Sequence, residues 1–225
     1  MTILDPLTVL PLRAVLWDWD GTLVDSGEYH WLAWREALAA EGYDLTFEGF
    51  VASFGQRNAG ILRGYLGQDL SDSEVERICA VKEVHFRRLV ETRGIQLLPG
   101  VHRWLAHLRG EGWRQAIASS APRLNIEMIL ETLDLTRYFD ALVSAEDVQR
   151  GKPDPQVFLV AAERVAVPPA RCIVVEDAPV GVESAHRAGM RVMGVRLTHA
   201  TLEADWIVQT LDDLPEDAFD RLLRR

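Results

Sequence analysis

The 225-residue sequence has little cysteine and no long apolar run, and each shortage excludes a class of protein. Cys79 and Cys172 are its two cysteines, too few for a disulfide framework or a zinc cluster, and we expect both to be buried free thiols. No stretch approaches the roughly 20 apolar residues that cross a bilayer. Residues Met1 to Leu12 include Asp5 and Pro6 and lack a basic flank, so they do not resemble a signal peptide. The default expectation is a cytoplasmic monomer without membrane contacts.

Basic charge is also in short supply. Lysine and arginine number 24 against 34 aspartates and glutamates, so the formal net charge is −10. An acidic chain lacks the positive surface typical of nucleic-acid-binding proteins. An anionic substrate would therefore need a locally positive site, built from a metal ion and a few fixed cations.

What the sequence does contain is an alternation of strand and helix patterns. Hydrophobic residues make up 48% and charged residues 26%, as in ordinary globular proteins. Short apolar runs predict strands at residues 14–17, 115–119, 141–144, 172–176 and 191–195. Helical periodicity fills most gaps between them, for example at residues 123–133, 157–165 and 181–188. This alternation predicts an α/β fold with a parallel sheet covered by helices on both faces, a Rossmann-like three-layer core.

One segment departs from this alternation. Residues 26–97 contain no convincing strand, and their apolar residues recur at helical spacing. Ser71 and Glu74 form a capping-box pattern that predicts a long helix reaching about Thr92. We therefore expect a core of residues 1–25 and 98–225 and an inserted, all-helical cap domain of residues 26–97. Ligands gather beyond the carboxyl ends of parallel strands, where such an insert would form a lid.

The first polar motif follows the first strand and reads Asp18-Trp19-Asp20-Gly21-Thr22. Side chains two apart in an extended segment share a face, so the carboxylates of Asp18 and Asp20 should lie together. Paired carboxylates can divide the tasks of nucleophile or metal ligand and proton carrier. An acidic turn without a catalytic role would have the same sequence pattern. An EF-hand calcium loop would not, because Gly21 comes too early for that pattern.

Two further motifs could hold an anion. Ser119 ends a strand and is followed by Ser120, and hydroxyl and N–H groups there can bind phosphate oxygens, although a lone serine is often a turn or cap residue. Lys152 lies between Gly151 and Pro153, which would fix its ammonium in space, whereas a solvated lysine before a helix is the alternative. Neither motif makes a serine-hydrolase elbow or a P-loop.

The fourth motif, Glu176-Asp177, ends another buried strand. Two acids in such a place are costly unless something positive binds them. Carboxylate oxygens completed by phosphate and water suit Mg²⁺. Either acid alone could instead cap a helix.

Together the four motifs resemble those of the haloacid dehalogenase superfamily, and the resemblance runs essentially end to end. Asp-x-Asp-Gly-Thr, Ser119, Lys152 and Glu176-Asp177 occur in its order. The stretches around Glu28-Tyr29-His30, Ala33-Trp34 and Val175–Met190 look like the subgroup that contains β-phosphoglucomutase and many sugar-phosphate phosphatases. The helical insert looks like that subgroup's cap.

The resemblance implies a phosphatase that acts on a small phosphorylated metabolite, such as a sugar phosphate. Asp18 would attack phosphorus and become an aspartyl phosphate, while Asp20 would protonate the leaving oxygen and then activate water. Mg²⁺ would be held by Asp18, by the Asp20 backbone carbonyl and by Asp177, with Glu176 close by.

The resemblance also implies that Ser119 and Lys152 bind the transferring group. The further candidates for substrate binding are Thr22, His30, Trp34, Arg57, Asn58, Lys82 and Ser120. Residue type alone favours a structural role for a helical histidine such as His30, packing for Trp34 and a solvated position for Lys82.

Two departures bear on the reaction. Thr22 stands where the mutase pattern commonly has valine, and Arg57 lies one place earlier than the arginine of the mutase cap. A mutase must grip the distal phosphate of a bisphosphate, so we favour a phosphatase over a phosphosugar mutase. Dehalogenation needs no metal, and the paired acids Glu176-Asp177 argue against it. A non-catalytic phospho-ligand-binding protein is the remaining alternative.

Overall fold

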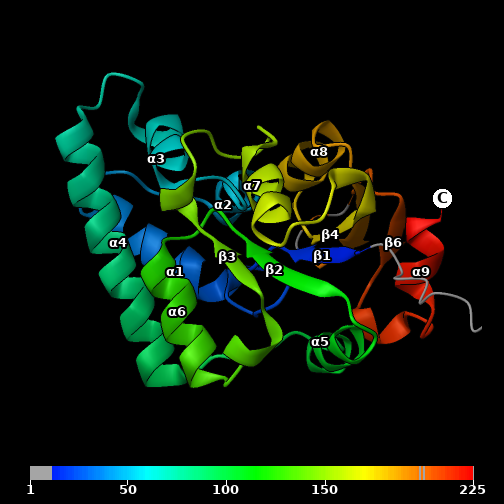
Figure 1. Cartoon of the computed structure of the whole chain (residues 1–225). Helices are drawn as coiled ribbons and strands as arrows, with labels where there is room; N and C mark the ends of the chain where they lie inside the picture. Colours follow the sequence, from blue (N-terminus) through cyan, green and yellow to red (C-terminus); the bar gives the residue numbers. More distant parts are fainter. Residues whose placement is uncertain (1–11, 198, 200, 225) are drawn as a thin grey trace, which may run out of the picture.

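The computed structural model describes residues 12–197, 199 and 201–224 (Figure 1). The N-terminal stretch in which no signal peptide is expected lies, apart from Leu12, outside these ranges. Within them, no helix is both long enough and apolar enough to cross a membrane. Cys172 is buried, as predicted, whereas Cys79 is only half-buried.

A parallel sheet of six strands forms the centre, in the order β3-β2-β1-β4-β5-β6. The bounds are β1 Ala14–Trp17, β2 Arg114–Ala118, β3 Ala141–Val143, β4 Cys172–Glu176, β5 Arg191–Val195 and β6 Trp206–Val208. The predicted α/β fold with a parallel sheet is confirmed. β6 was not predicted, because it has three residues and none of them is buried.

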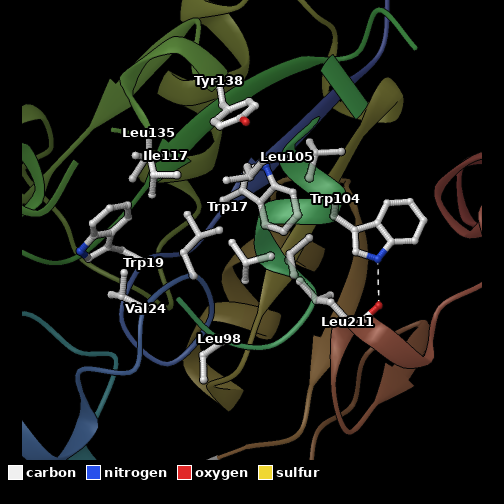
Figure 2. Close-up of a cluster of buried hydrophobic side chains, with 14 of the residues drawn as sticks. Trp17, Trp19, Val24, Leu98, Trp104, Leu105, Ile117, Leu135, Tyr138 and Leu211 are labelled. Carbon is white, nitrogen blue, oxygen red and sulfur yellow. Dashed lines mark hydrogen bonds between the residues drawn. The ribbon is translucent and has the colours of Figure 1, made fainter. Parts of the chain in front are cut away.

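Side chains of successive strand residues point to opposite faces, as the period of two requires. Val15 and Trp17 pack under α5 (Val101–Gly110), α6 (Arg123–Thr132) and α9 (Ala218–Leu223). Figure 2 shows this cluster, in which the indole N–H of Trp104 donates to the Leu211 carbonyl at 2.8 Å. Ala14 and Leu16 pack instead under α7 (Gln156–Arg164) and α8 (Pro179–Arg187). The sheet is thus the middle of three layers.

Four helices form the cap, on the left of Figure 1, whereas α9 lies at the opposite end. They are α1 (Gly27–Ala39), α2 (Phe47–Ser53), α3 (Asn58–Leu66) and α4 (Asp72–Arg93). The helices share a separate apolar cluster that includes Trp34, Phe50 and Leu62. The capping box of Ser71 and Glu74 forms as predicted at the start of α4.

The chain enters and leaves the cap along two adjacent crossings. Val24 and Leu97 form an antiparallel bridge. The Asp25 N–H donates to the Gln96 carbonyl at 3.0 Å, and the Leu98 N–H donates to the Leu23 carbonyl at 3.0 Å. Four short 3₁₀ helices, Thr136–Tyr138, Ala145–Asp147, Pro169–Arg171 and Leu211–Asp213, complete the described elements.

Candidate active site

Asp18 lies directly after β1, where its backbone N–H donates to the Val175 carbonyl of β4 at 3.0 Å. Its carboxylate accepts from the Lys152 ammonium at 2.5 Å, and the same ammonium donates to Glu176 at 2.6 Å. All three side chains are buried. Lys152 precedes α7 and Glu176 ends β4, so three distant segments meet at one edge of the sheet.

Burial has the largest effect on the ionisation of Asp18. It raises the pKa of Asp18 to about 7, an effect that Lys152 opposes and Glu176 reinforces. Burial would by itself lower the pKa of Lys152, but Asp18 and Glu176 raise that pKa on balance. The ammonium is therefore a fixed positive charge beside the candidate nucleophile.

The carboxylates of Asp18, Glu176 and Asp177 offer ligand atoms that all lie within 4.8 Å of one another. Three buried carboxylates face one ammonium, so a divalent cation would neutralise the remainder. A Cβ at Gly21 would lie 2.3 Å from Asp177 Oδ2, so only glycine leaves this carboxylate its position. The donor set fits Mg²⁺, a hard cation that prefers oxygen ligands.

Glu176 differs from the other two acids. One of its oxygens accepts from Lys152 at 2.6 Å, and the other accepts from the Ala178 N–H at 2.7 Å. Both oxygens thus have protein donors, which suits a residue that orients Lys152. Asp18 and Asp177 are the carboxylates better placed to hold a metal, while the Asp20 carboxylate lies outside this group of three.

Asp20 is held from the cap side. Its Oδ1 accepts from the Ser26 hydroxyl at 2.6 Å and lies 3.0 Å from His30 Nε2. The Lys82 ammonium lies 2.9 Å from His30 Nδ1. Because an ammonium can only donate, Nδ1 must accept and the ring proton is on Nε2, the nitrogen that lies near Asp20. Burial opposes the ionisation of Asp20, yet His30, Ser26 and Lys82 together keep its pKa below the ordinary value.

Ser119 follows β2, and its N–H donates to the Val143 carbonyl at 2.9 Å. Its hydroxyl oxygen accepts from the Ala121 N–H at 3.0 Å, so its O–H hydrogen can point to a ligand. Ser119, Ser120 and Ala121 form one wall of a pocket. The strand end thus presents a hydroxyl on the same side as Asp18.

The pocket is enclosed jointly by the core and the cap. Its lining residues are Asp18, Asp20, His30, Trp34, Phe50, Phe54, Gly55, Gln56, Asn58, Ile61, Lys82, Ser119, Ser120, Ala121 and Pro122. The structure therefore brings most of the sequence-predicted site residues to one place. It also buries Lys82, with 1% of its surface exposed, although a lysine in a long helix is ordinarily solvated.

Two predicted substrate-binding residues lie elsewhere. The Arg57 guanidinium donates to the carbonyls of Ala145, Val148 and Gln149 at 2.9, 3.3 and 3.0 Å, which fixes it to the core outside the pocket lining. It takes this direction because carbonyls near the 3₁₀ turn 145–147 accept all three bonds. Thr22 is buried, with its hydroxyl 3.5 Å from Asp177.

Sequence reasoning missed several residues of the site. Phe50, Phe54, Gln56 and Ile61 line the pocket, but their helical pattern resembles ordinary packing. Glu83, whose carboxylate accepts from the Lys82 ammonium at 2.8 Å beside the pocket, was missed because neighbours on a helix point in different directions, so a Lys-Glu pair looks like two surface residues. Its charge directly beside Lys82 was the available signal.

Comparison with known proteins agrees with this geometry. A family model described as haloacid dehalogenase-like hydrolase matches residues 12–189. The chain is 33% identical to a β-phosphoglucomutase of Bacillus subtilis over 214 residues, covering 90% of this chain and 92% of the relative. It is 32% identical to a fructose-1-phosphate phosphatase of Escherichia coli over 190 residues, covering 81% and 96%.

Among solved structures, a β-phosphoglucomutase from Clostridium difficile superposes with a TM-score of 0.85 at 23% identity. The match covers 95% of this chain and all (100%) of that one, and at this identity it shows a shared fold. The family model spans well over half of the sequence, including all four polar motifs. The chain therefore belongs to the haloacid dehalogenase-like hydrolase family.

Proposed function

We propose that this chain is a Mg²⁺-dependent phosphatase that hydrolyses a small phosphate monoester, with sugar phosphates as the substrate class. The observation that carries the proposal is the pairing of buried Asp18 with Lys152, 2.5 Å apart, at a pocket shared by core and cap. The E. coli relative named as a fructose-1-phosphate phosphatase supports the substrate class. We also propose that the chain divides into a core of residues 1–25 and 98–225 and a cap of residues 26–97.

In the first step, an Asp18 oxygen attacks phosphorus, the bond from phosphorus to the ester oxygen breaks, and Asp20 gives its proton to that oxygen. An alcohol leaves and an aspartyl phosphate remains. In the second step, water attacks phosphorus and passes a proton to Asp20, which releases phosphate and restores the Asp18 carboxylate. Lys152 and Ser119 hold the transferring oxygens throughout.

Asp20 must alternate between acid and base in this scheme. Its contacts with Ser26 and His30 keep it ionised in the substrate-free protein, the state in which it accepts a proton from water. A dianionic substrate next to it would raise its pKa and favour the protonated form required for the first step. Mg²⁺ held by Asp18 and Asp177 would supply positive charge that offsets the repulsion between carboxylate and phosphate.

A panel of phosphorylated sugars and polyols, assayed for phosphate release with Mg²⁺ and with EDTA, tests the proposal. We expect turnover of at least one member that EDTA abolishes and that Asp18→Asn reduces by about 10³-fold or more. Turnover by Asp18→Asn at the wild-type level would refute the nucleophile. Metal-dependent phosphate binding without turnover would favour the non-catalytic alternative.

A phosphosugar mutase is the second candidate, and the relative named β-phosphoglucomutase, at 33% identity, is the observation that favours it. Against it, the cap arginine Arg57 is bound to core carbonyls rather than lining the pocket. Incubation with β-glucose 1-phosphate, a trace of the 1,6-bisphosphate and Mg²⁺ separates the two. Formation of glucose 6-phosphate without net phosphate release would favour the mutase.

A further inference from the structure

Outside the pocket lining, cap and core meet through a buried carboxylate. Glu83, on cap helix α4, is 6% exposed. One of its oxygens accepts from the Lys82 ammonium at 2.8 Å and from the Asn58 amide at 2.6 Å. The other accepts from the amide of Asn125, which lies on core helix α6. Glu83 therefore joins two cap helices to the core.

Asn125 is the matching group on the core side, with 1% of its surface exposed. Its amide nitrogen donates to Glu83, and its amide oxygen accepts from the Arg87 guanidinium at 3.0 Å. Glu83 and Arg87 are four residues apart, so they lie on one face of α4. A single core side chain thus contacts that face with both its donor and its acceptor.

The contact continues inward to the reacting groups. From Glu83 it passes through Lys82 and His30 to the Oδ1 atom of Asp20, with separations of 2.8, 2.9 and 3.0 Å. It therefore starts on the core at Asn125, crosses the cap, and returns to the core at Asp20. Each member from Glu83 to His30 is buried.

We propose that Glu83 and Asn125 are positioning residues, which link the seating of the cap on the core to the placement of the proton-transferring carboxylate of Asp20. This inference rests on the proposed phosphatase function. When the cap lies against α6, the amide of Asn125 fixes Glu83, which fixes the ammonium that orients His30. When the cap moves away, this fixed path to Asp20 is lost.

The chemistry of the path explains why a carboxylate is needed at its centre. Lys82 is enclosed by the rings of Trp34 and Phe86, 5.4 and 5.3 Å from its nitrogen, and a buried ammonium requires a partner. Although burial opposes it, Lys82 and His30 hold the pKa of Glu83 below its ordinary value. A neutral side chain at position 83 would leave the ammonium free to turn away from His30.

The leaving group separates this role from simple adhesion of the cap. A sugar alkoxide needs a proton from Asp20, whereas p-nitrophenolate leaves without one. Asn125→Leu and Glu83→Gln should therefore lower kcat for fructose 1-phosphate, or for the best sugar phosphate of the panel, by roughly 10- to 100-fold. For p-nitrophenyl phosphate the same variants should lose less than about 3-fold.

A matched control and an exchange sharpen the comparison. Arg57→Gln removes the cap–core contact to residues 145–149, which no side-chain hydrogen bond among the described residues connects to Asp20, and should affect both substrates by the same factor. Asn125→Asp places a second carboxylate against Glu83 and should be the most impaired variant. Combining it with Glu83→Gln restores one amide facing one carboxylate but leaves Lys82 without a carboxylate at position 83, so kcat for the sugar phosphate should stay at about the level of Glu83→Gln alone.

Equal losses for the two substrates, or recovery of kcat in the exchanged pair, would overturn the inference and leave Glu83 and Asn125 as simple adhesion between the domains. If circular dichroism shows that Asn125→Leu does not fold, Asn125→Ser replaces it, with the same expected losses of kcat for the sugar phosphate and for p-nitrophenyl phosphate. A wild-type protein that releases phosphate from neither substrate overturns the proposed function itself, and the inference with it.

Discussion

Asp18 combines reactivity with a cost in stability, because it is buried beside Glu176 with Lys152 as the nearest counter-charge. Its pKa rises from an ordinary 3.8 to about 7, so the folded protein binds this proton more tightly than the unfolded chain. The stabilising contribution is therefore present below about pH 4 and is lost as the pH rises through about 7. Above that, an ionised Asp18 destabilises the metal-free protein.

Asp18→Asn should consequently raise the melting temperature in EDTA at pH 8, by a few degrees, and should leave it nearly unchanged at pH 4 to 5. The asparagine needs no ionisation, while Lys152 retains Glu176 as its partner. Differential scanning fluorimetry across this pH range measures the effect. A variant that is less stable than the wild type at pH 8 would contradict the assigned cause.

Gly181 is the second residue whose environment dictates its identity. A Cβ there would lie 1.6 Å from a Glu176 oxygen, and that oxygen is already fixed by Lys152. Gly181→Ala should therefore displace Glu176, lower stability by about 1–3 kcal/mol and reduce turnover at least about ten-fold.

Gly64 offers the matched control for this prediction. It lies in α3, and a Cβ there would meet no atom of the described residues within 4 Å. Gly64→Ala should stabilise the protein by about 0.5–1 kcal/mol without changing turnover. Urea unfolding and phosphate-release assays measure both variants, and similar behaviour of the two would show that the space at Gly181 is not critical.

At the scale of single elements, the start of α4 is the clearest case of local sequence determining structure. Ser71 accepts from the Glu74 N–H, and the Glu74 carboxylate accepts from the Ser71 N–H at 3.0 Å. Ser71→Ala should lower the free energy of unfolding by about 1 kcal/mol. Ser71 lies eleven residues before Lys82 in the sequence, so turnover at 25 °C should not change. A loss of turnover without loss of stability would indicate coupling along α4 instead.

Elements and their ends were predictable where the signal is local. The five predicted strands contain short apolar runs that stop at a polar residue, such as Trp17 before Asp18, and both cues are present in sequence. β6 lies at the edge of the sheet beside β5. Trp206, Ile207 and Val208 all favour strands, but a run of three residues is shorter than the roughly four to eight on which a strand prediction rests.

The direction of side chains at the boundary between cap and core was the other feature that could not be predicted from the sequence. Arg57 follows the loop glycine Gly55, which made it a plausible substrate-binding cation. Its guanidinium turns instead to carbonyls of residues 145–149, which are about 90 residues away along the chain. The direction depends on where the cap rests on the core, and this packing has no local signal.

At the scale of the whole molecule, the site exists only because two units meet. Asp18, Lys152 and Asp177 belong to the sheet edge, whereas His30 and Lys82 belong to the cap, and the pocket lies between them. The paired crossings at Val24 and Leu97 allow the cap to enter and leave at one place. Such a pair of crossings is where a change in backbone angles would move the cap as a unit.

A metal ion at the sheet edge should therefore stabilise the whole molecule, independently of any substrate. A ligand that binds only the folded state at 100 times its Kd adds about 2.7 kcal/mol, and Mg²⁺ would in addition relieve the repulsion among three buried carboxylates. Saturating Mg²⁺ should raise the melting temperature by several degrees. Asp177→Asn should remove most of this increase, whereas Asp69→Asn, at an exposed acid, should preserve it. An equal increase in melting temperature in both variants would mean that the ion binds elsewhere on this acidic chain and that the carboxylate cluster is not the metal site.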